Sequence, residues 1–417
     1  MLTPKWTEIG ARIEALLRQR VHLSRIPCFD YAIRHHGQLV AAGHGGWGSV
    51  EEKTALGANS LFRLFSMTKP VTSVAALMLV DEGKITLDEP VSRVLPELGG
   101  LSVLDGLRTD GSLKTRPMTR PMTLRHLLTH TAGLTYHFMA YPESDGQLRE
   151  GPVQRLYRQQ GIKPAARLIG ALPGDADPIC NGADLLRAVG SIPLVDEPGA
   201  QFHYSIATDL VGLVIERLTG SSLGSALTTR VFEPLGMGDT AFQVSGADVG
   251  RFTSNYRLSA QGLDLVERWC DSDYLRQPTL ESGGGGLVST AADYGRFLEM
   301  LRAGGTLDGR RYLSADMHAQ MCRAQLSPQV MAPSNLEASA GTGFGLGLGI
   351  YENSILARTP VPVGSLFWNG AAGTCCWIDP RHDVTCVVMT QVLDNDSFRL
   401  DRLLHREVYD GDGVLRA

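Results

Sequence analysis

The sequence predicts an α/β fold of two lobes, one built from both ends of the chain and one inserted between them. Strand-like apolar runs occur at residues 28–42 and return at residues 344–391. Between these regions, the longest apolar patterns have helical spacing. We therefore expect an α/β lobe formed by residues 1–86 and 280–417 and a mostly helical lobe formed by residues 87–279. The candidate active site is expected in the cleft between them.

Composition limits the class of protein and its partners. The 417 residues include 43% hydrophobic and 20% charged residues, as in an ordinary globular protein. A net charge of −5 argues against a nucleic acid or an anionic membrane as partner. The seven scattered cysteines are typical of free thiols, and the charged N-terminal segment does not resemble a signal peptide. We expect a cytoplasmic protein, and the sequence leaves its oligomeric state open.

The N-terminal elements follow from apolar spacing. Trp6, Ile9, Ile13 and Leu17 recur at helical intervals and predict a helix over residues 4–20. Two strand-like runs at residues 28–34 and 38–42 flank a His-Gly turn and predict a hairpin. A second helix is predicted over residues 70–82, because apolar residues again recur at helical spacing and Gly83 ends the pattern.

The later elements alternate between loops, helices and strands. Residues 87–123 read as loop-rich, and Gly283 to Gly286 as a flexible turn near the cleft. Helices are predicted over residues 124–129, 183–191, 206–219 and 293–303. Strands are predicted over residues 344–351, 365–369, 374–379 and 384–391, the last two joined by a turn at 380–383.

Ser66 and Lys69 form a Ser-x-x-Lys motif where the long predicted helix begins. Residues three apart share a helix face, so both side chains project to one spot at the helix N-terminus. Backbone N–H groups and the helix dipole favour a developing negative charge there. A desolvated lysine can be neutral and accept the serine proton, which activates the serine for acyl transfer. The same tetrapeptide also fits an ordinary helix start with a capping serine and a surface lysine.

Two further segments supply candidate groups. Tyr204 follows a Glu-Pro-Gly turn and precedes a predicted helix, where a phenol beside a Ser/Lys pair could pass a proton to a leaving group. A tyrosine taken alone is more often a packing residue. Farther along, Gly370 follows Trp368 and Asn369 at the end of a predicted strand, and a glycine there permits close backbone approach to a ligand.

Other motifs compete for a functional role. Gly220-Ser221-Ser222-Leu223-Gly224 matches the Gly-x-Ser-x-Gly pattern, which acts as a nucleophile elbow only between a strand and a helix. Here it follows a predicted helix, so Ser222 is disfavoured as the nucleophile. His126 and His130 are four residues apart, a spacing that can bind zinc, but the glutamate of the catalytic zinc motif is replaced by Leu127. We expect core or hydrogen-bonding histidines there, and no metal site.

Several motifs occur along the chain in the order found in a known family. This order runs through Ser66-Met67-Thr68-Lys69, the segment from Thr123 to Leu134, Tyr204-Ser205, the segment from Gly283 to Asp293, Phe344-Gly345-Leu346-Gly347 and Trp368-Asn369-Gly370. In this order the chain resembles the serine β-lactamase-like superfamily, and within it the family VIII carboxylesterases and the fungal statin side-chain acyltransferases. The resemblance covers nearly the whole chain. It implies a class C β-lactamase-like fold, with a central antiparallel sheet flanked by helices and an inserted, mostly helical lobe.

The resemblance also implies the roles of residues. Ser66 would be the nucleophile, Lys69 its general base and Tyr204 the proton shuttle. The backbone N–H groups of Ser66 and Ala371 would form the oxyanion hole. The remaining positions expected to contact the substrate are Trp368, Asn369, Gly370 and Ile206. No metal or organic cofactor is implied.

Two departures separate this chain from β-lactamases and D,D-peptidases. Trp368-Asn369-Gly370 stands where those enzymes have Lys-Thr-Gly, and no lysine follows Lys163 to replace that cation. Ile206 replaces the asparagine of their Tyr-x-Asn motif. Both changes remove groups suited to anionic, amide-bearing substrates.

These departures favour a serine carboxylesterase that hydrolyses small neutral carboxylic esters. The alternatives are an acyltransferase that passes the same acyl group to an alcohol, and a β-lactamase or D,D-peptidase-like hydrolase. A non-catalytic binding relative is disfavoured by the joint presence of Ser66, Lys69 and Tyr204. The expected partner is a small-molecule ester. The acyl length, the stereopreference and the extent of any β-lactam hydrolysis stay open.

Overall fold

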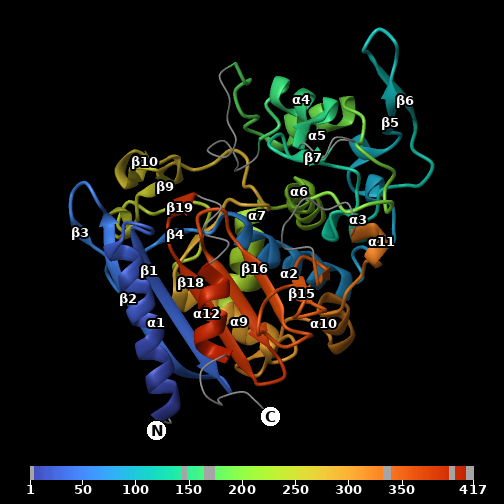
Figure 1. The fold of residues 1–417 in the computed structure, drawn as a ribbon. Helices are drawn as coiled ribbons and strands as arrows, with labels where there is room; N and C mark the ends of the chain where they lie inside the picture. The colour runs from blue at the N-terminus through green and yellow to red at the C-terminus, as the bar shows by residue number, and fades with distance from the viewer. Residues whose placement is uncertain (1–3, 143–147, 164–173, 332–339, 394–399, 410–417) are drawn as a thin grey trace.

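An eight-stranded antiparallel sheet forms the centre of the protein. The computed structural model describes residues 4–142, 148–163, 174–331, 340–393 and 400–409. Strand order across the sheet is β14-β15-β16-β17-β18-β1-β2-β3. The strands span Cys28–His35 (β1), Gln38–Ser49 (β2), Thr54–Ala55 (β3), Thr342–Phe344 (β14), Gly349–Tyr351 (β15), Leu366–Asn369 (β16), Cys375–Asp379 (β17) and Val384–Met389 (β18). Because β1 pairs with β18, strands from the two ends of the chain share one sheet (Figure 1).

Helices cover both faces of this sheet. On one face, α1 (Pro4–His22) and α12 (Leu400–Tyr409) pack together, and Figure 1 shows both in front of the strands. On the other face lie α2 (Thr68–Asp81) and α9 (Ala291–Arg302). Each face of the sheet has its own hydrophobic core. Cys375 packs in the core on the α1 and α12 side and Cys376 in the core on the α2 and α9 side, because neighbouring strand residues point to opposite faces. The fold class predicted from the sequence is confirmed.

The predicted strand over residues 344–351 is wrong in one respect, because the chain forms two strands there. Phe344 at the end of β14 pairs with Gly349 at the start of β15, and the intervening residues form a tight turn. Gly347 has φ +92°, and a Cβ atom there would lie 2.1 Å from Ser73 Oγ. A glycine is therefore required at this turn. The apolar residues of the turn concealed the break in the sequence pattern.

The segment between the chain ends contains helices and several small sheets. Its helices are α3 (Leu124–Leu128), α4 (Pro152–Gln159), α5 (Gly182–Ser191), α6 (Ala207–Thr219), α7 (Leu223–Leu227) and α8 (Glu233–Leu235). Hairpins form between β5 (Ser102–Leu107) and β6 (Leu113–Pro117) and between β7 (Ala140–Pro142) and β8 (Leu148–Glu150). Figure 1 shows α4, α5 and the β5–β6 hairpin on the side of the molecule away from α1.

Part of the predicted helical lobe is β-structure that joins the C-terminal segment. Strands β9 (Asn255–Ser259) and β10 (Gly262–Glu267) form a three-stranded sheet with β19 (Val392–Leu393). The division of the chain at residues 87 and 279 stays a prediction. The other short elements are β4 (Phe62–Arg63), β11 (Val288–Ser289), β12 (Thr306–Leu307), β13 (Arg310–Arg311), α10 (Ala315–Met321) and α11 (Pro328–Met331).

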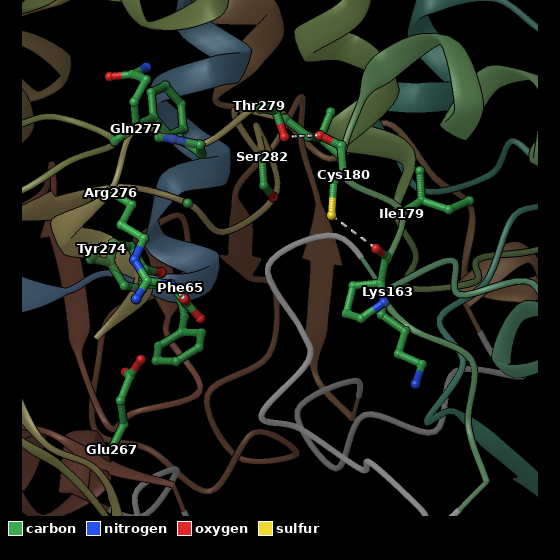
Figure 2. A pocket seen from close by; sticks show the side chains of 16 residues that line it. Phe65, Lys163, Ile179, Cys180, Glu267, Tyr274, Arg276, Gln277, Thr279 and Ser282 are labelled. Carbon is green, nitrogen blue, oxygen red and sulfur yellow. Dashed lines mark hydrogen bonds and ion pairs between the residues drawn. The ribbon is translucent and has the colours of Figure 1, made fainter. Parts of the chain in front are cut away.

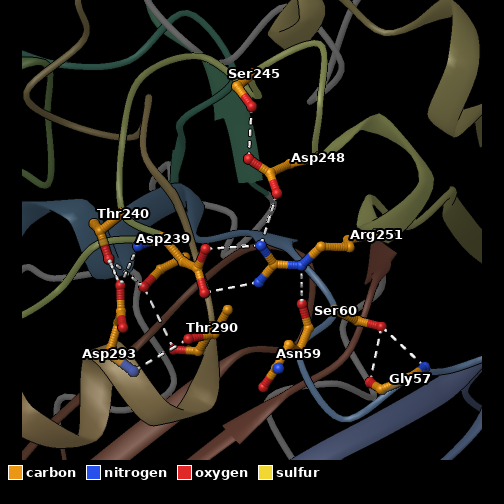
Figure 3. A network of polar contacts seen from close by, with 11 residues as sticks. Gly57, Asn59, Ser60, Asp239, Thr240, Ser245, Asp248, Arg251, Thr290 and Asp293 are labelled. Carbon is orange, nitrogen blue, oxygen red and sulfur yellow. Dashed lines mark hydrogen bonds and ion pairs between the residues drawn. The ribbon is translucent and has the colours of Figure 1, made fainter.

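A polar network centred on Arg251 holds the chain that leads into β4 (Figure 3). The guanidinium donates to both carboxylate oxygens of Asp239, at 2.8 and 2.7 Å, and to Asp248 at 2.8 Å. Its Nε donates to the Asn59 carbonyl at 2.8 Å. Asp293, at the start of α9, accepts from the Asp239 N–H at 2.8 Å. The network therefore connects the region before β4 with the start of α9.

Within the described part of the chain, no helix has the length and apolar character needed to cross a membrane. The seven cysteines are all free thiols in the structure.

Candidate active site

Ser66 lies in a short 3₁₀ turn, η1 (Phe65–Met67), that leads directly into α2. The predicted helix is confirmed, and it begins two residues earlier than expected. Phe65, immediately before the serine, has φ +46°, a left-handed conformation that is strained for a bulky residue. Backbone strain of this kind concentrates at functional sites. The turn leaves Ser66 half-buried, with its hydroxyl facing Lys69 and Tyr204.

Lys69 is buried and lies beside the serine. Its Nζ is 3.3 Å from Ser66 Oγ, 3.0 Å from Tyr136 Oη and 2.8 Å from the Gly284 carbonyl oxygen. Burial lowers the pKa of Lys69 to about 7, and the negative charge of Asp209 opposes part of that shift. A substantial fraction of Lys69 is therefore neutral at neutral pH and able to accept a proton.

Tyr204 completes the arrangement from the segment just before α6. Its hydroxyl donates to Ser66 Oγ at 2.7 Å. Burial raises the pKa of Tyr204 above its usual value, so the phenol stays protonated near pH 7. The Lys69 ammonium nitrogen lies 4.7 Å from the centre of the Tyr204 ring. The structure thus brings together the three residues that the sequence named as the catalytic group.

Tyr136 and Asp209 belong to the same site but were missed by the sequence reasoning. Tyr136 is buried, and its hydroxyl contacts Lys69. Asp209 lies in the first turn of α6, and its Oδ1 accepts from the Gly284 N–H at 3.1 Å and from the Ser282 hydroxyl. Gly284 therefore connects Asp209, through its N–H, with Lys69, through its carbonyl. A lone tyrosine or aspartate gives no local signal in a sequence, although position 136 closely follows the Thr123–Leu134 motif.

The run from Gly283 to Gly286 forms a turn at the site, as predicted, and two of its glycines are closely packed. A Cβ atom on Gly283 would lie 2.7 Å from the Thr208 carbonyl oxygen, and one on Gly284 would lie 2.5 Å from Asp209 Oδ2. Both distances are too short for any larger residue, so the glycines serve close packing against α6. This packing places the Gly284 carbonyl against Lys69.

Trp368, on β16, contacts the nucleophile turn directly. Its indole Nε1 donates to the Ser66 carbonyl at 2.9 Å. Gly370 packs closely behind, because a Cβ atom there would lie 2.3 Å from the Leu64 carbonyl oxygen. The glycine therefore permits approach to the protein backbone, and Ala371 follows it in the turn between β16 and β17. The end of β16 therefore lies beside the nucleophile turn.

Two predicted substrate contacts are not supported by the structure. The Asn369 side chain points to the face opposite Trp368, where its Nδ2 donates to Asp401 of α12 at 3.4 Å. Ile206 is 0% exposed and belongs to the hydrophobic core. Side-chain alternation along the strand explains the first result, and helix packing explains the second. The Ile206 side chain is therefore not available to a ligand in this conformation.

The competing motifs have structural roles. Ser222 is the N-cap of α7, and its hydroxyl accepts from the Ser225 N–H, so it lacks the strand-turn-helix setting of a nucleophile elbow. His126 Nδ1 accepts from the Thr123 N–H in a capping box at the start of α3. His130 is buried, with Nδ1 3.2 Å from the Ser205 hydroxyl. The prediction of hydrogen-bonding histidines is confirmed.

The chain is also similar to known proteins. Residues 13–410 match the Beta-lactamase family, and the chain belongs to that family of serine hydrolases. It is 29% identical to Esterase EstB of Burkholderia gladioli, over 92% of this chain and 90% of that protein. It is also 29% identical to the monacolin J acid methylbutanoyltransferase of Aspergillus terreus, over 79% of this chain and 76% of that protein.

The solved structures agree on the fold. The structure of EstCE1, described as a hydrolase with promiscuous acyltransferase activity, superposes with a TM-score of 0.77 and 26% identity. The match covers 98% of this chain and 100% of that one. The resemblance found in the sequence is confirmed.

Proposed function

We propose that this protein is a serine carboxylesterase that hydrolyses neutral carboxylic esters through an acyl-enzyme on Ser66. One observation carries the proposal: Ser66 Oγ lies between Lys69 Nζ, at 3.3 Å, and Tyr204 Oη, at 2.7 Å. A nucleophile within reach of both a base and an acid has the groups that ester cleavage requires. The names of the relatives EstB and EstCE1 support ester hydrolysis within the family.

In the proposed mechanism, neutral Lys69 takes the Ser66 proton as the serine attacks the ester carbonyl. Tyr204 is a protonated phenol in the resting enzyme. It gives its proton to the departing alcohol and is then reprotonated by the protonated Lys69. Water then attacks the acyl-enzyme by the reverse sequence of proton transfers. Tyr136 and the Gly284 carbonyl hold the Lys69 amine in place, and Asp209 positions Gly284.

We propose that the oxyanion of the tetrahedral intermediate is bound by the backbone N–H groups of Ser66 and Ala371. Two contacts support this assignment by bringing the β16–β17 turn against the nucleophile turn: the Trp368 indole with the Ser66 carbonyl, and Gly370 with the Leu64 carbonyl. Donors fixed in this way stabilise charge that develops only during the reaction.

The residues around Trp368 support a preference for neutral substrates over substrates that carry a carboxylate. An indole that is committed to the Ser66 carbonyl stands where β-lactamases have a lysine, and the chain has no lysine after Lys163. An unpaired substrate carboxylate buried there would weaken binding by roughly a thousandfold. We expect kcat/KM for p-nitrophenyl butanoate to exceed that for a penicillin by at least that factor. A β-lactam turned over as well as the ester would contradict the proposal.

Acyl transfer to an alcohol is the second candidate. It is favoured by the description of EstCE1 as having promiscuous acyltransferase activity and by the name of the monacolin J acid methylbutanoyltransferase. The same acyl-enzyme serves both reactions, so product analysis with water and an added alcohol as competing acceptors separates them. We propose that water is the main acceptor of the acyl group. We also propose that the enzyme works in the cytoplasm, because its free cysteines would stay reduced there. A predominance of the transferred ester at millimolar alcohol would favour the second candidate.

Removing the Tyr204 hydroxyl should impair turnover. We expect Tyr204→Phe to lower kcat/KM by roughly 10²-fold or more, because the leaving alcohol loses its proton donor. Tyr136→Phe should have a smaller effect, since Tyr136 contacts Lys69 and not the serine. Tyr31→Phe is the matched control, because its hydroxyl bonds to the Gly10 carbonyl on the other face of the sheet. A near-normal rate in Tyr204→Phe would remove Tyr204 from the mechanism.

The pH dependence should report Lys69. Activity requires its neutral form, so kcat/KM should rise with pH and level off above the Lys69 pKa of about 7. Asp209 raises that pKa, because a nearby negative charge favours the ammonium. Asp209→Asn should therefore move the acid limb to lower pH, by roughly one unit. Asp248→Asn, in the distant Arg251 network, should leave the limb in place. An unmoved or upward-shifted limb in Asp209→Asn would refute the assignment.

A further inference from the structure

A cavity of about 400 Å³ opens beside the nucleophile turn (Figure 2). Phe65, the residue before Ser66, forms part of its wall. Ser282 and Gly286 line it as well, and they flank Gly284, whose carbonyl contacts Lys69. The cavity therefore adjoins the reacting centre. Its volume falls in the range of pockets that hold whole drug-sized molecules, roughly 300–1,000 Å³.

The wall of the cavity is largely apolar. Phe65 and Phe242 are buried side chains of this wall, and Ile179 and Leu280 are half-buried. Figure 2 shows Phe65 and Ile179 on opposite sides of the opening. Such a surface favours an apolar ligand group through the hydrophobic effect.

The charges on the wall sum to zero, and each lies near an opposite charge. Lys163 is 3.0 Å from Asp175, and Glu267 is 2.7 Å from the buried Arg63. Arg276 is 3.5 Å from Asp273, and both line the cavity. A ligand carboxylate would have to compete with these internal partners, so the cavity favours a neutral group.

The position of Tyr204 indicates which half of an ester enters the cavity. Its ring packs among other aromatic side chains, with centroid distances of 5.4 Å to Tyr136, 4.8 Å to His130 and 5.9 Å to Trp368. The leaving alcohol must lie beside Tyr204 to receive its proton. The acyl half must then extend from the carbonyl carbon in another direction, and the cavity beside Phe65 is adjacent.

We infer that this cavity binds the acyl half of the substrate, and that this half is a bulky, neutral, mainly apolar group. The inference rests on the proposed function, and it changes the expectation of a small ester. An acetyl or butanoyl group would leave most of the cavity filled with water. A larger acyl group displaces that water and buries apolar surface.

Binding to the Ser66→Ala protein tests the inference without turnover. Titration calorimetry would compare p-nitrophenyl esters that share the leaving group and differ in the acyl group. We expect the 4-cyclohexylbutanoyl ester to bind at least tenfold more tightly than the acetyl ester. An ester of similar length that ends in a carboxylate should bind at least tenfold more weakly than the cyclohexyl ester. Equal affinities, or tighter binding of the carboxylate, would overturn the inference.

Cavity-filling variants locate the binding site. In the Ser66→Ala background, Leu280→Trp should reduce the preference for the cyclohexyl ester at least tenfold. Gln277→Trp, at an exposed position of the cavity wall, should act in the same direction without disturbing the core. Leu39→Trp is the control, because Leu39 is an exposed leucine on β2. An unchanged preference in both cavity variants would overturn the inference.

Comparing turnover by the unmodified enzyme with turnover by Ser66→Ala separates this inference from the proposed function. If Ser66→Ala still hydrolyses p-nitrophenyl acetate at the normal rate, the proposed function fails, whatever the binding data show. If Ser66→Ala is inactive but the acyl preference does not respond to Leu280→Trp and Gln277→Trp, the function stands and the acyl site is wrong.

Discussion

Ser66→Ala should abolish ester turnover, with a loss of roughly 10⁴-fold or more in kcat. The serine oxygen is the atom that forms the acyl-enzyme, and no neighbouring group can take its place in that bond. This oxygen contacts Lys69 and Tyr204, a base and an acid that can move its proton. The measurement is p-nitrophenyl butanoate hydrolysis by protein whose circular dichroism spectrum matches that of the unmodified enzyme.

Ser222→Ala is the matched control for this substitution. Ser222 lies in the competing Gly-x-Ser-x-Gly motif but caps α7. Its loss should lower the free energy of unfolding by about 1 kcal/mol and leave kcat nearly unchanged. A folded but inactive Ser222→Ala protein, or an active Ser66→Ala protein, would mean that the nucleophile has been assigned wrongly.

Lys69→Arg should be nearly as damaging as Lys69→Ala, with a loss on the order of 10²-fold or more in kcat/KM. Lysine can lose its proton in this buried position, as its pKa of about 7 indicates. A guanidinium stays protonated and cannot act as the base. It would also have to fit between Tyr136 and the Gly284 carbonyl, which lie 3.0 and 2.8 Å from the amine. Retaining the positive charge therefore should not retain activity.

Lys84→Arg controls for the substitution itself, because Lys84 is exposed just beyond the end of α2. It should leave kcat/KM unchanged. The decisive comparison is Lys69→Arg with Lys69→Ala, each assayed across pH 6 to 9. Substantial activity in the arginine variant would transfer the role of general base to Tyr204 or another group.

The sequence predicted the parts of the site that are marked by a local spacing of residues or by the order of motifs along the chain. Ser66 and Lys69 are three residues apart on one helical turn, so their proximity follows from helix geometry. Tyr204 and Trp368 were found because their motifs occur in the family's order. The strands themselves were predictable from their apolar runs and turns, and their arrangement in a central antiparallel sheet was implied by the family resemblance.

The parts that were missed depend on packing between distant segments. Tyr136, in the segment after α3, contacts Lys69 directly. Asp209, on α6, is linked to Lys69 through Gly284, and neither arrangement leaves a local pattern in the sequence. The glycine run looked flexible because a sequence does not show what lies against it. The orientation of Asn369 is a different case. With Trp368 facing the nucleophile, strand alternation already places its neighbour on the opposite face.

Covalent trapping is the most direct test of whether Ser66 forms the acyl-enzyme. The enzyme would be mixed with p-nitrophenyl butanoate, quenched in acid within milliseconds, digested, and analysed by mass spectrometry. We expect a butanoyl adduct on the peptide that contains Ser66, formed together with a burst of p-nitrophenol and absent in Ser66→Ala. An adduct on any other residue, such as Ser222, or ester turnover without an adduct in the wild-type enzyme under burst conditions, would contradict this expectation.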